Sequence, residues 1–154
     1  MTIQSRPAWP TIIAIGVVVF GLSALGPSAE GAGQEAAQLV TQQQVEDALG
    51  TSVTVETRGA NGYSYTSTSP AGGVTIDITS AEVVAILKGD SATIEGLGDE
   101  AFFQSSSSRM AILIARKGTK AMTLSVLFPL GLPDAVSDIK ELAQDLAALA
   151  LAKL

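Results

Sequence analysis

Apolar and polar residues alternate along three short segments in the first half of the chain. The segments are residues 52–58, 63–66 and 74–79. Their apolar or aromatic side chains are two positions apart: Val53 and Val55, Tyr63 and Tyr65, and Val74, Ile76 and Ile78. This period of two is typical of β-strands that bury one face. Turn-forming residues separate the segments at 59–62, which include an Asn-Gly pair, and at 69–73. The pattern therefore predicts three antiparallel strands in a meander.

A second group of strands is predicted in the later half of the chain. Residues 122–128 alternate in the same way, and residues 101–105 are interpreted as a further strand. Residues 110–115 are apolar on both faces, as in a strand from the middle of a sheet. Polar turns are expected at 105–108 and 117–120, so this group also forms a meander.

A short helix is predicted over residues 41–49. Thr41 and Gln44 have the spacing of a capping box, Val40 and Val45 that of a hydrophobic staple. Gly50 follows as the left-handed residue that ends the helix.

Two further helices are predicted, a short one at residues 80–88 and a long one that begins near Pro133 and runs towards the C-terminus. In the long helix, Asp134 and Asp138 lie near the positive end of the dipole. Its apolar residues recur with a period of 3.6; they are Val136, Ile139, Leu142, Ala143, Leu146, Leu149 and Ala150. The predicted fold class is α+β, with an antiparallel sheet of about six strands in two meanders packed against a short N-terminal, a short middle and a long C-terminal helix.

The first 33 residues have the pattern of an export signal. Arg6 precedes an uncharged apolar run over residues 11–26, which is shorter than the roughly 20 residues that a spanning helix needs. Pro27 and several small residues follow, and we expect cleavage close to residue 32 or 34. This predicts a secreted or periplasmic protein with a signal peptide at 1–33, a linker at 34–39 and one domain at 40–154. The alternative is an uncleaved segment that anchors the domain to the membrane through residues 11–26.

The amino-acid composition limits the partners and reactions that we expect for this chain. The net charge is −6, and an acidic surface repels phosphate backbones, so we expect no nucleic-acid partner. The chain contains no Cys and no His. It therefore lacks disulfides, thiolate metal ligands and the commonest general base. We expect no cofactor, no metal site and no enzymatic activity.

Four residues are candidates for ligand binding. Asp99 and Glu100 follow a Gly-Leu-Gly turn, and paired carboxylates there could bind a cation or act as acid and base. The structural interpretation, in which they satisfy backbone groups of the turn, is favoured. Tyr63 and Tyr65 lie on one face of a strand and could line a ligand groove, although a half-buried sheet face is the more common role of such residues.

Several of these segments resemble small exported bacterial domains of unknown function. The resemblance rests on the opening helix at 40–50, the Gly-Leu-Gly-Asp-Glu-Ala-Phe-Phe motif at 96–103, the Arg-Lys-Gly at 116–118 and a strand that runs into Pro129. These residues are similar to actinobacterial secreted lipoproteins and, in layout, to the extracellular sensor domain of a mycobacterial serine/threonine kinase. The lipid-modified Cys and the paired cysteines of some such proteins are missing here, which argues against a lipid tether.

The expected function is that of an exported, non-catalytic binding or sensing domain whose partner is a small molecule or an envelope protein. The resemblance implies such a domain, with a cleft between sheet and helices, and no catalytic residue that can be assigned here. One alternative is a membrane-anchored envelope interaction module. A carboxylate-dependent enzyme that uses Asp99 and Glu100 is a more remote one.

Overall fold

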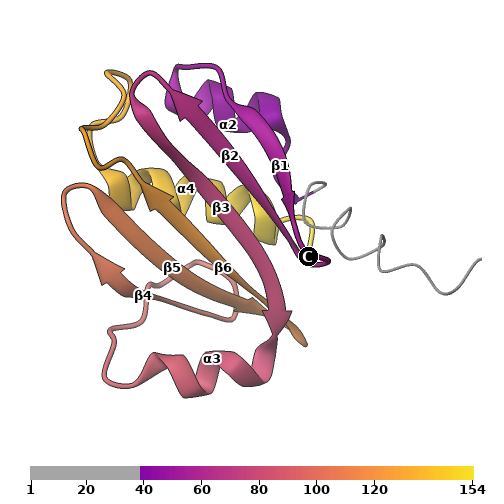
Figure 1. The fold of residues 1–154 in the computed structure, drawn as a ribbon. Coiled ribbons are helices and arrows are strands. Elements are labelled where there is room, and N and C mark those ends of the chain that lie inside the picture. The colour runs from indigo at the N-terminus through magenta and orange to yellow at the C-terminus, as the bar shows by residue number, and fades with distance from the viewer. Residues whose placement is uncertain (1–38) are drawn as a thin grey trace, which may run out of the picture.

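The structure is a computed structural model that describes residues 39–154. In this part of the chain an antiparallel sheet of six strands is combined with three helices, which confirms the α+β class (Figure 1). In chain order the elements are α2 (Gln42–Leu49), β1 (Thr54–Arg58), β2 (Gly62–Thr68), β3 (Ala71–Ser80), α3 (Ala81–Lys88), β4 (Glu100–Ser106), β5 (Met110–Lys117), β6 (Lys120–Leu127) and α4 (Ile139–Leu151).

The sheet consists of two meanders joined along their last strands. The strand order is β1-β2-β3-β6-β5-β4, and every neighbouring pair is antiparallel. The join is the pairing of β3 with β6, in which Ile76 lies opposite Leu124. Both side chains are fully buried. The two predicted meanders are therefore confirmed, and the segment that is apolar on both faces, β5, has a strand on each side.

One face of the sheet is covered by α2 and α4, which lie behind it in Figure 1. The strand residues that point to these helices alternate with residues on the opposite face, as a period of two requires. They form one continuous cluster with the helices. Its fully buried large side chains include Tyr65, Ile76, Leu113, Leu124 and Leu146.

The opposite face is covered only in part. Helix α3 packs there against β4, β5 and β6, in a small second cluster. Val84 is the only side chain of α3 that is buried, and it lies against Phe102, Ile114 and Ala121. The half of this face formed by β1, β2 and β3 carries mostly polar side chains. We call this half the open face, and we include in it the neighbouring residues of β5 and β6 whose side chains point away from α2 and α4.

The first predicted helix forms with the expected caps. The hydroxyl of Thr41 accepts a hydrogen bond from the backbone N–H of Gln44, and Gln44 Oε1 accepts one from the backbone N–H of Thr41. Gly50 adopts φ +66° and ends the helix. Val40 and Val45 are both fully buried. The middle helix is confirmed as well, although the Ser80 side chain makes no capping bond.

The C-terminal helix is shorter than predicted. It has 13 residues and begins at Ile139, because the carboxylate of Asp138 caps it by accepting from the N–H groups of Lys140 and Glu141. Pro133, expected in its first turn, lies instead in the connection from β6. Leu149, predicted to be in the apolar stripe, is 38% exposed. The burial of Leu146 and of the other stripe residues is confirmed.

Two of the predicted turns are shifted. Gly72 and Gly73 belong to β3, because the loop between β2 and β3 contains only Ser69 and Pro70. The loop between β1 and β2 contains residues 59–61, so the glycine of the Asn-Gly pair already lies in β2. Pairing along the strands therefore extends further than the turn-forming residues suggested.

The described core begins at Leu39, which the sequence assigned to the linker and which is 3% exposed. No helix within residues 39–154 has the length and apolar character needed to span a membrane. The predicted export signal at 1–33 lies outside the described residues.

Candidate functional site

The Asp99–Glu100 segment is shaped by the two glycines before it. Gly96 and Gly98 have φ of +78° and +68°, a region that residues with a Cβ rarely adopt. Gly98 is also tightly packed, since a Cβ at this position would lie 2.5 Å from the carbonyl oxygen of Arg116. The same carbonyl accepts a hydrogen bond of 2.8 Å from the N–H of Asp99. The turn therefore lies against β5 and directs both carboxylates towards basic residues.

Both carboxylates have partners within the domain. Asp99 Oδ2 accepts a 2.7 Å hydrogen bond from the N–H of Gly118 and lies 3.9 Å from Arg116 Nη1. Glu100 Oε1 is 2.6 Å from Lys88 Nζ, and its Oε2 is 3.6 Å from Arg116 Nε. The hydrogen bond from Lys88, supported by the positive charges of Lys88 and Arg116, holds the pKa of Glu100 below its usual value.

These contacts connect three parts of the fold. Glu100 links β4 to the end of α3 through Lys88, and Asp99 holds the tight turn between β5 and β6 through Gly118. Within residues 39–154, no group of three or more acidic side chains has the arrangement of a metal site. The contacts support the structural interpretation of Asp99 and Glu100, and their binding of a ligand stays a prediction.

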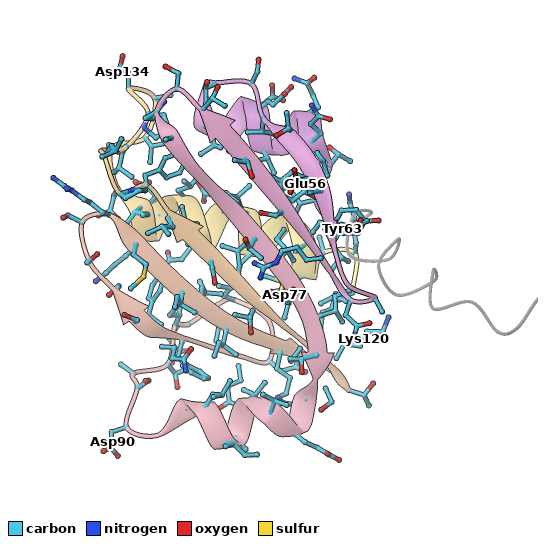
Figure 2. The ribbon with its side chains drawn as sticks, viewed as in Figure 1. Glu56, Tyr63, Asp77, Asp90, Lys120 and Asp134 are labelled. Carbon is cyan, nitrogen blue, oxygen red and sulfur yellow. The ribbon has the colours of Figure 1, made fainter. Side chains whose placement is uncertain are left out.

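The two tyrosines point to the helix-covered face of the sheet. Tyr65 is 1% exposed, and its hydroxyl donates a hydrogen bond to the carbonyl oxygen of Val40. Burial raises the pKa of Tyr65 to about 12. Tyr63, labelled in Figure 2, is half-buried and packs against the main core. Tyr65 therefore has a structural role, while ligand binding by Tyr63 and Tyr65 stays a prediction.

The basic residues near β5 are engaged in the fold. Arg109 Nη1 donates to the carbonyl oxygen of Pro129 at 3.0 Å. Lys117 Nζ donates at 2.7 Å to the carbonyl oxygen of Leu151, at the C-terminal end of α4. Together with the ion pairs of Arg116, these bonds attach loops and helix ends to the sheet.

A surface that the sequence did not indicate lies on the open face, which is turned towards the viewer in Figure 2. A hollow of about 540 Å³ extends over β2, β3 and the end of β6. We call it the Gly73 hollow, because Gly73 lies in its floor between Thr66 of β2 and Leu127 of β6. It is lined by Ser64, Thr66, Ser67, Thr68, Ala71, Gly72, Gly73, Thr75, Leu127 and Pro129.

Strand register arranges the lining in rows across the sheet. In the first row Thr66 is opposite Gly73, which is opposite Leu127. In the second row Ser64 is opposite Thr75, and their hydroxyls are 3.4 Å apart. Position 73 has no room for a side chain, because a Cβ there would clash with the carbonyl oxygen of Tyr65 on β2. The first row is therefore flat at Gly73, with the hydroxyl of Thr66 on one side and the apolar side chain of Leu127 on the other.

The sequence contained the signal for this hollow, but it was assigned to a turn. Gly72 and Gly73 were grouped with Ser69 and Pro70, whereas a glycine inside a strand marks a site of close backbone approach or an unfilled position. The sequence did indicate a polar face, because Ser64, Thr66 and Thr68 are two positions apart along the strand. Which part of that face α3 would cover could not be read from the pattern.

Comparison with known proteins adds no relative: no family model, no curated protein and no solved structure matches the chain.

Proposed function

We propose that this chain is an exported, non-catalytic binding or sensing domain that recognises its ligand on the open face. The observation that carries the proposal is the Gly73 hollow, a concave, uncharged surface on one half of the sheet. Its volume lies within the range of about 300–1,000 Å³ typical of small-molecule sites. Export is proposed from the apolar run at residues 11–26 and the small residues after it.

The contacts of the carboxylates favour binding over catalysis. A general acid or base needs a group that is free to exchange a proton with a substrate. Glu100 is shared between Lys88 and Arg116, and Asp99 accepts from the backbone of Gly118. Within residues 39–154, the hydroxyls of the hollow make no hydrogen bond to a carboxylate that would activate a nucleophile. A binding role requires only the shape and hydrogen-bonding groups that the hollow provides.

Two measurements test the proposal. Intact-mass analysis of the protein from the extracellular or periplasmic fraction should show a start near residue 32 or 34; a full-length chain in the membrane pellet would support the anchored alternative. Residues 34–154, which include the whole described core, should be titrated with a library of uncharged fragments and followed by amide NMR shifts. We expect shifts at Thr66, Gly73 and Leu127. Shifts confined to the Asp99 turn, or none at all, would contradict the proposed surface.

A further inference from the structure

We propose that the Gly73 hollow binds an uncharged amphiphile, a molecule with an alkyl or acyl chain and a head group that carries hydroxyls. The inference rests on the proposed function, because it names a chemical class of ligand for the same surface. Three properties of the described residues support it: the charges around the hollow, the free hydroxyls in its wall and the exposed apolar side chains at one end.

The residues that line the hollow carry no charge. A charged head group would lose water against these walls without gaining an ionic partner there. Four charged side chains border the hollow. Arg58, Glu56 and Asp77 lie near Ser64 and Thr75, with Arg58 Nη1 3.4 Å from Thr75 Oγ1. Arg109 lies at the other end, where its Nη1 donates to the carbonyl oxygen of Pro129. Figure 2 labels the two acidic ones. Because two acidic and two basic groups balance each other around the hollow, a charged head group of either sign gains little from them.

Hydroxyl groups in the wall are available to a ligand. Within residues 39–154, the side-chain oxygens of Thr66 and Thr68 have no hydrogen-bond partner. The hydroxyls of Ser64 and Thr75 are 3.4 Å apart, and Thr75 Oγ1 also accepts a hydrogen bond of 3.4 Å from Arg58 Nη1, so each of these contacts is long. A hydroxyl can donate and accept, so this set matches a head group that does the same.

Apolar side chains continue the hollow at the end of β6. Leu127 is 49% exposed and Leu130 is 79% exposed, and the exposed ring of Pro129 lies between them in the chain. Met110, opposite Leu127 on β5, is half-buried on the same face. An alkyl chain that left the hollow over Leu127 would cover this apolar surface. Sugar rings fit less well, because Tyr63 and Tyr65 are on the other face of the sheet and cannot stack on them.

The test compares three amphiphiles with the same chain length and different head groups. Residues 34–154 are used, because the apolar run at 11–26 would itself bind amphiphiles. Monooctanoylglycerol, octanoate and octylammonium are titrated below the concentrations at which they aggregate, and binding is followed by amide NMR shifts. We expect monooctanoylglycerol to bind with a dissociation constant of about 0.1–1 mM. We expect both charged compounds to bind about fivefold or more weakly.

Variants locate the site. Thr66→Val keeps the shape of the side chain and removes its hydroxyl, so it should raise the dissociation constant of monooctanoylglycerol about 3- to 10-fold. Leu127→Thr should weaken the binding of monooctanoylglycerol by a similar factor, because apolar contact with the alkyl chain is lost. Thr123→Val is the matched control, on the same face of β6 but outside the hollow, and should bind like the unmodified domain.

Several outcomes would overturn the inference. Tighter binding of octylammonium would indicate a cationic ligand attracted by Glu56 and Asp77, and tighter binding of octanoate would indicate an anionic ligand held by Arg58. Equal binding of all three, unaffected by Thr66→Val, would show nonspecific adsorption. If uncharged fragments shift Gly73 while monooctanoylglycerol does not bind, the ligand class is wrong and the proposed binding surface stands. If neither shifts Gly73, both proposals fail.

Discussion

The two faces of the sheet have different roles although they are made from the same strands. The helix-covered face carries large apolar side chains that form one core with α2 and α4. The opposite face carries hydroxyls, a few charges and only a small cluster under α3. Stability therefore depends mainly on one set of alternating residues. On the opposite face, the residues outside the cluster under α3 contribute less to the buried core.

The difference also separates residues that lie next to each other in the sequence. In β2, Tyr65 is buried at 1% exposure and Ser67 at 2%, whereas Thr66 and Thr68 are exposed. The carbonyl of Val40 and the hydroxyl of Tyr65 are paired inside the core, while the hydroxyl of Thr66 meets solvent. A binding surface can thus lie about one strand thickness from a closely packed interior.

The largest effect should come from the centre of the helix-covered face. Leu146→Ala should lower the free energy of unfolding by about 2–5 kcal/mol, because it removes a fully buried side chain from the middle of α4. Leu149→Ala is the matched control, with the same chemical change on the same helix at a residue that is 38% exposed. Urea denaturation of both variants measures the difference. Equal losses would mean that α4 presents another face to the sheet.

The next effect concerns the turn between α3 and β4. Gly98→Ala should cost about 2–3 kcal/mol, because the left-handed backbone is unfavourable for alanine and the new Cβ would meet the carbonyl oxygen of Arg116. Gly96→Ala tests the backbone contribution alone, since a Cβ there has no neighbour within 4 Å. It should cost about 1–2 kcal/mol. An unchanged midpoint for Gly98→Ala in denaturation would refute the packing seen at this turn.

Much of the fold could be predicted from the sequence because local signals agreed with the final packing. The Thr41 and Gln44 capping box, the left-handed Gly50 and the alternating segments all depend on near neighbours in the chain. The start of α4 was predicted wrongly because Pro133 and Asp138 both suit a helix N-terminus, and the choice between them depends on the path of the connection after β6. Leu149 follows the helical period but lies at the border of the buried stripe, since it is 38% exposed while Ala150 and Leu151 after it are buried.

The candidate site was harder to predict because it depends on pairing between distant strands. The Gly73 hollow exists because Thr66 and Leu127, 61 positions apart in numbering, flank the same glycine. Asp99 and Glu100 stood out in the sequence as a pair of charges, but their partners Arg116 and Lys88 are brought to them only by the sheet and by α3. Sequence spacing alone contains neither relationship.

A smaller loss of stability is expected from Tyr65→Phe than from Leu146→Ala and Gly98→Ala, and it should depend on pH. Tyr65→Phe should cost about 1–3 kcal/mol near neutral pH, because it leaves the buried carbonyl of Val40 without its donor. The folded state keeps the Tyr65 proton up to a pKa of about 12, above the value near 10 of the unfolded chain. Between these values the unfolded state binds fewer protons, so stability falls as pH rises, by at most about 1.4 kcal/mol per pH unit.

The control for this pH effect is Tyr63→Phe, since Tyr63 is half-buried and belongs to the same strand. Denaturation midpoints measured from pH 8 to pH 12 should fall less steeply for Tyr65→Phe than for the unmodified domain and for Tyr63→Phe. Parallel curves for all three proteins would show that the Tyr65 hydroxyl is not buried as described.

The smallest effect should come from Ser67, the one buried polar residue on the helix-covered side of β2. Its side chain is 2% exposed, and within residues 39–154 its Oγ has no hydrogen-bond partner. A buried hydroxyl without a partner keeps the cost of its lost hydration, so Ser67→Ala should leave stability unchanged or raise it by up to about 1 kcal/mol. Thermal and urea denaturation measure this change, and Ser64→Ala on the opposite face provides a matched control that should stay within about 0.5 kcal/mol. A loss of more than about 1 kcal/mol for Ser67→Ala would reveal a hydrogen bond or a buried water at this hydroxyl. In that case the polar character of the open face would extend through the sheet at this point, and the separation of the two faces would be incomplete there.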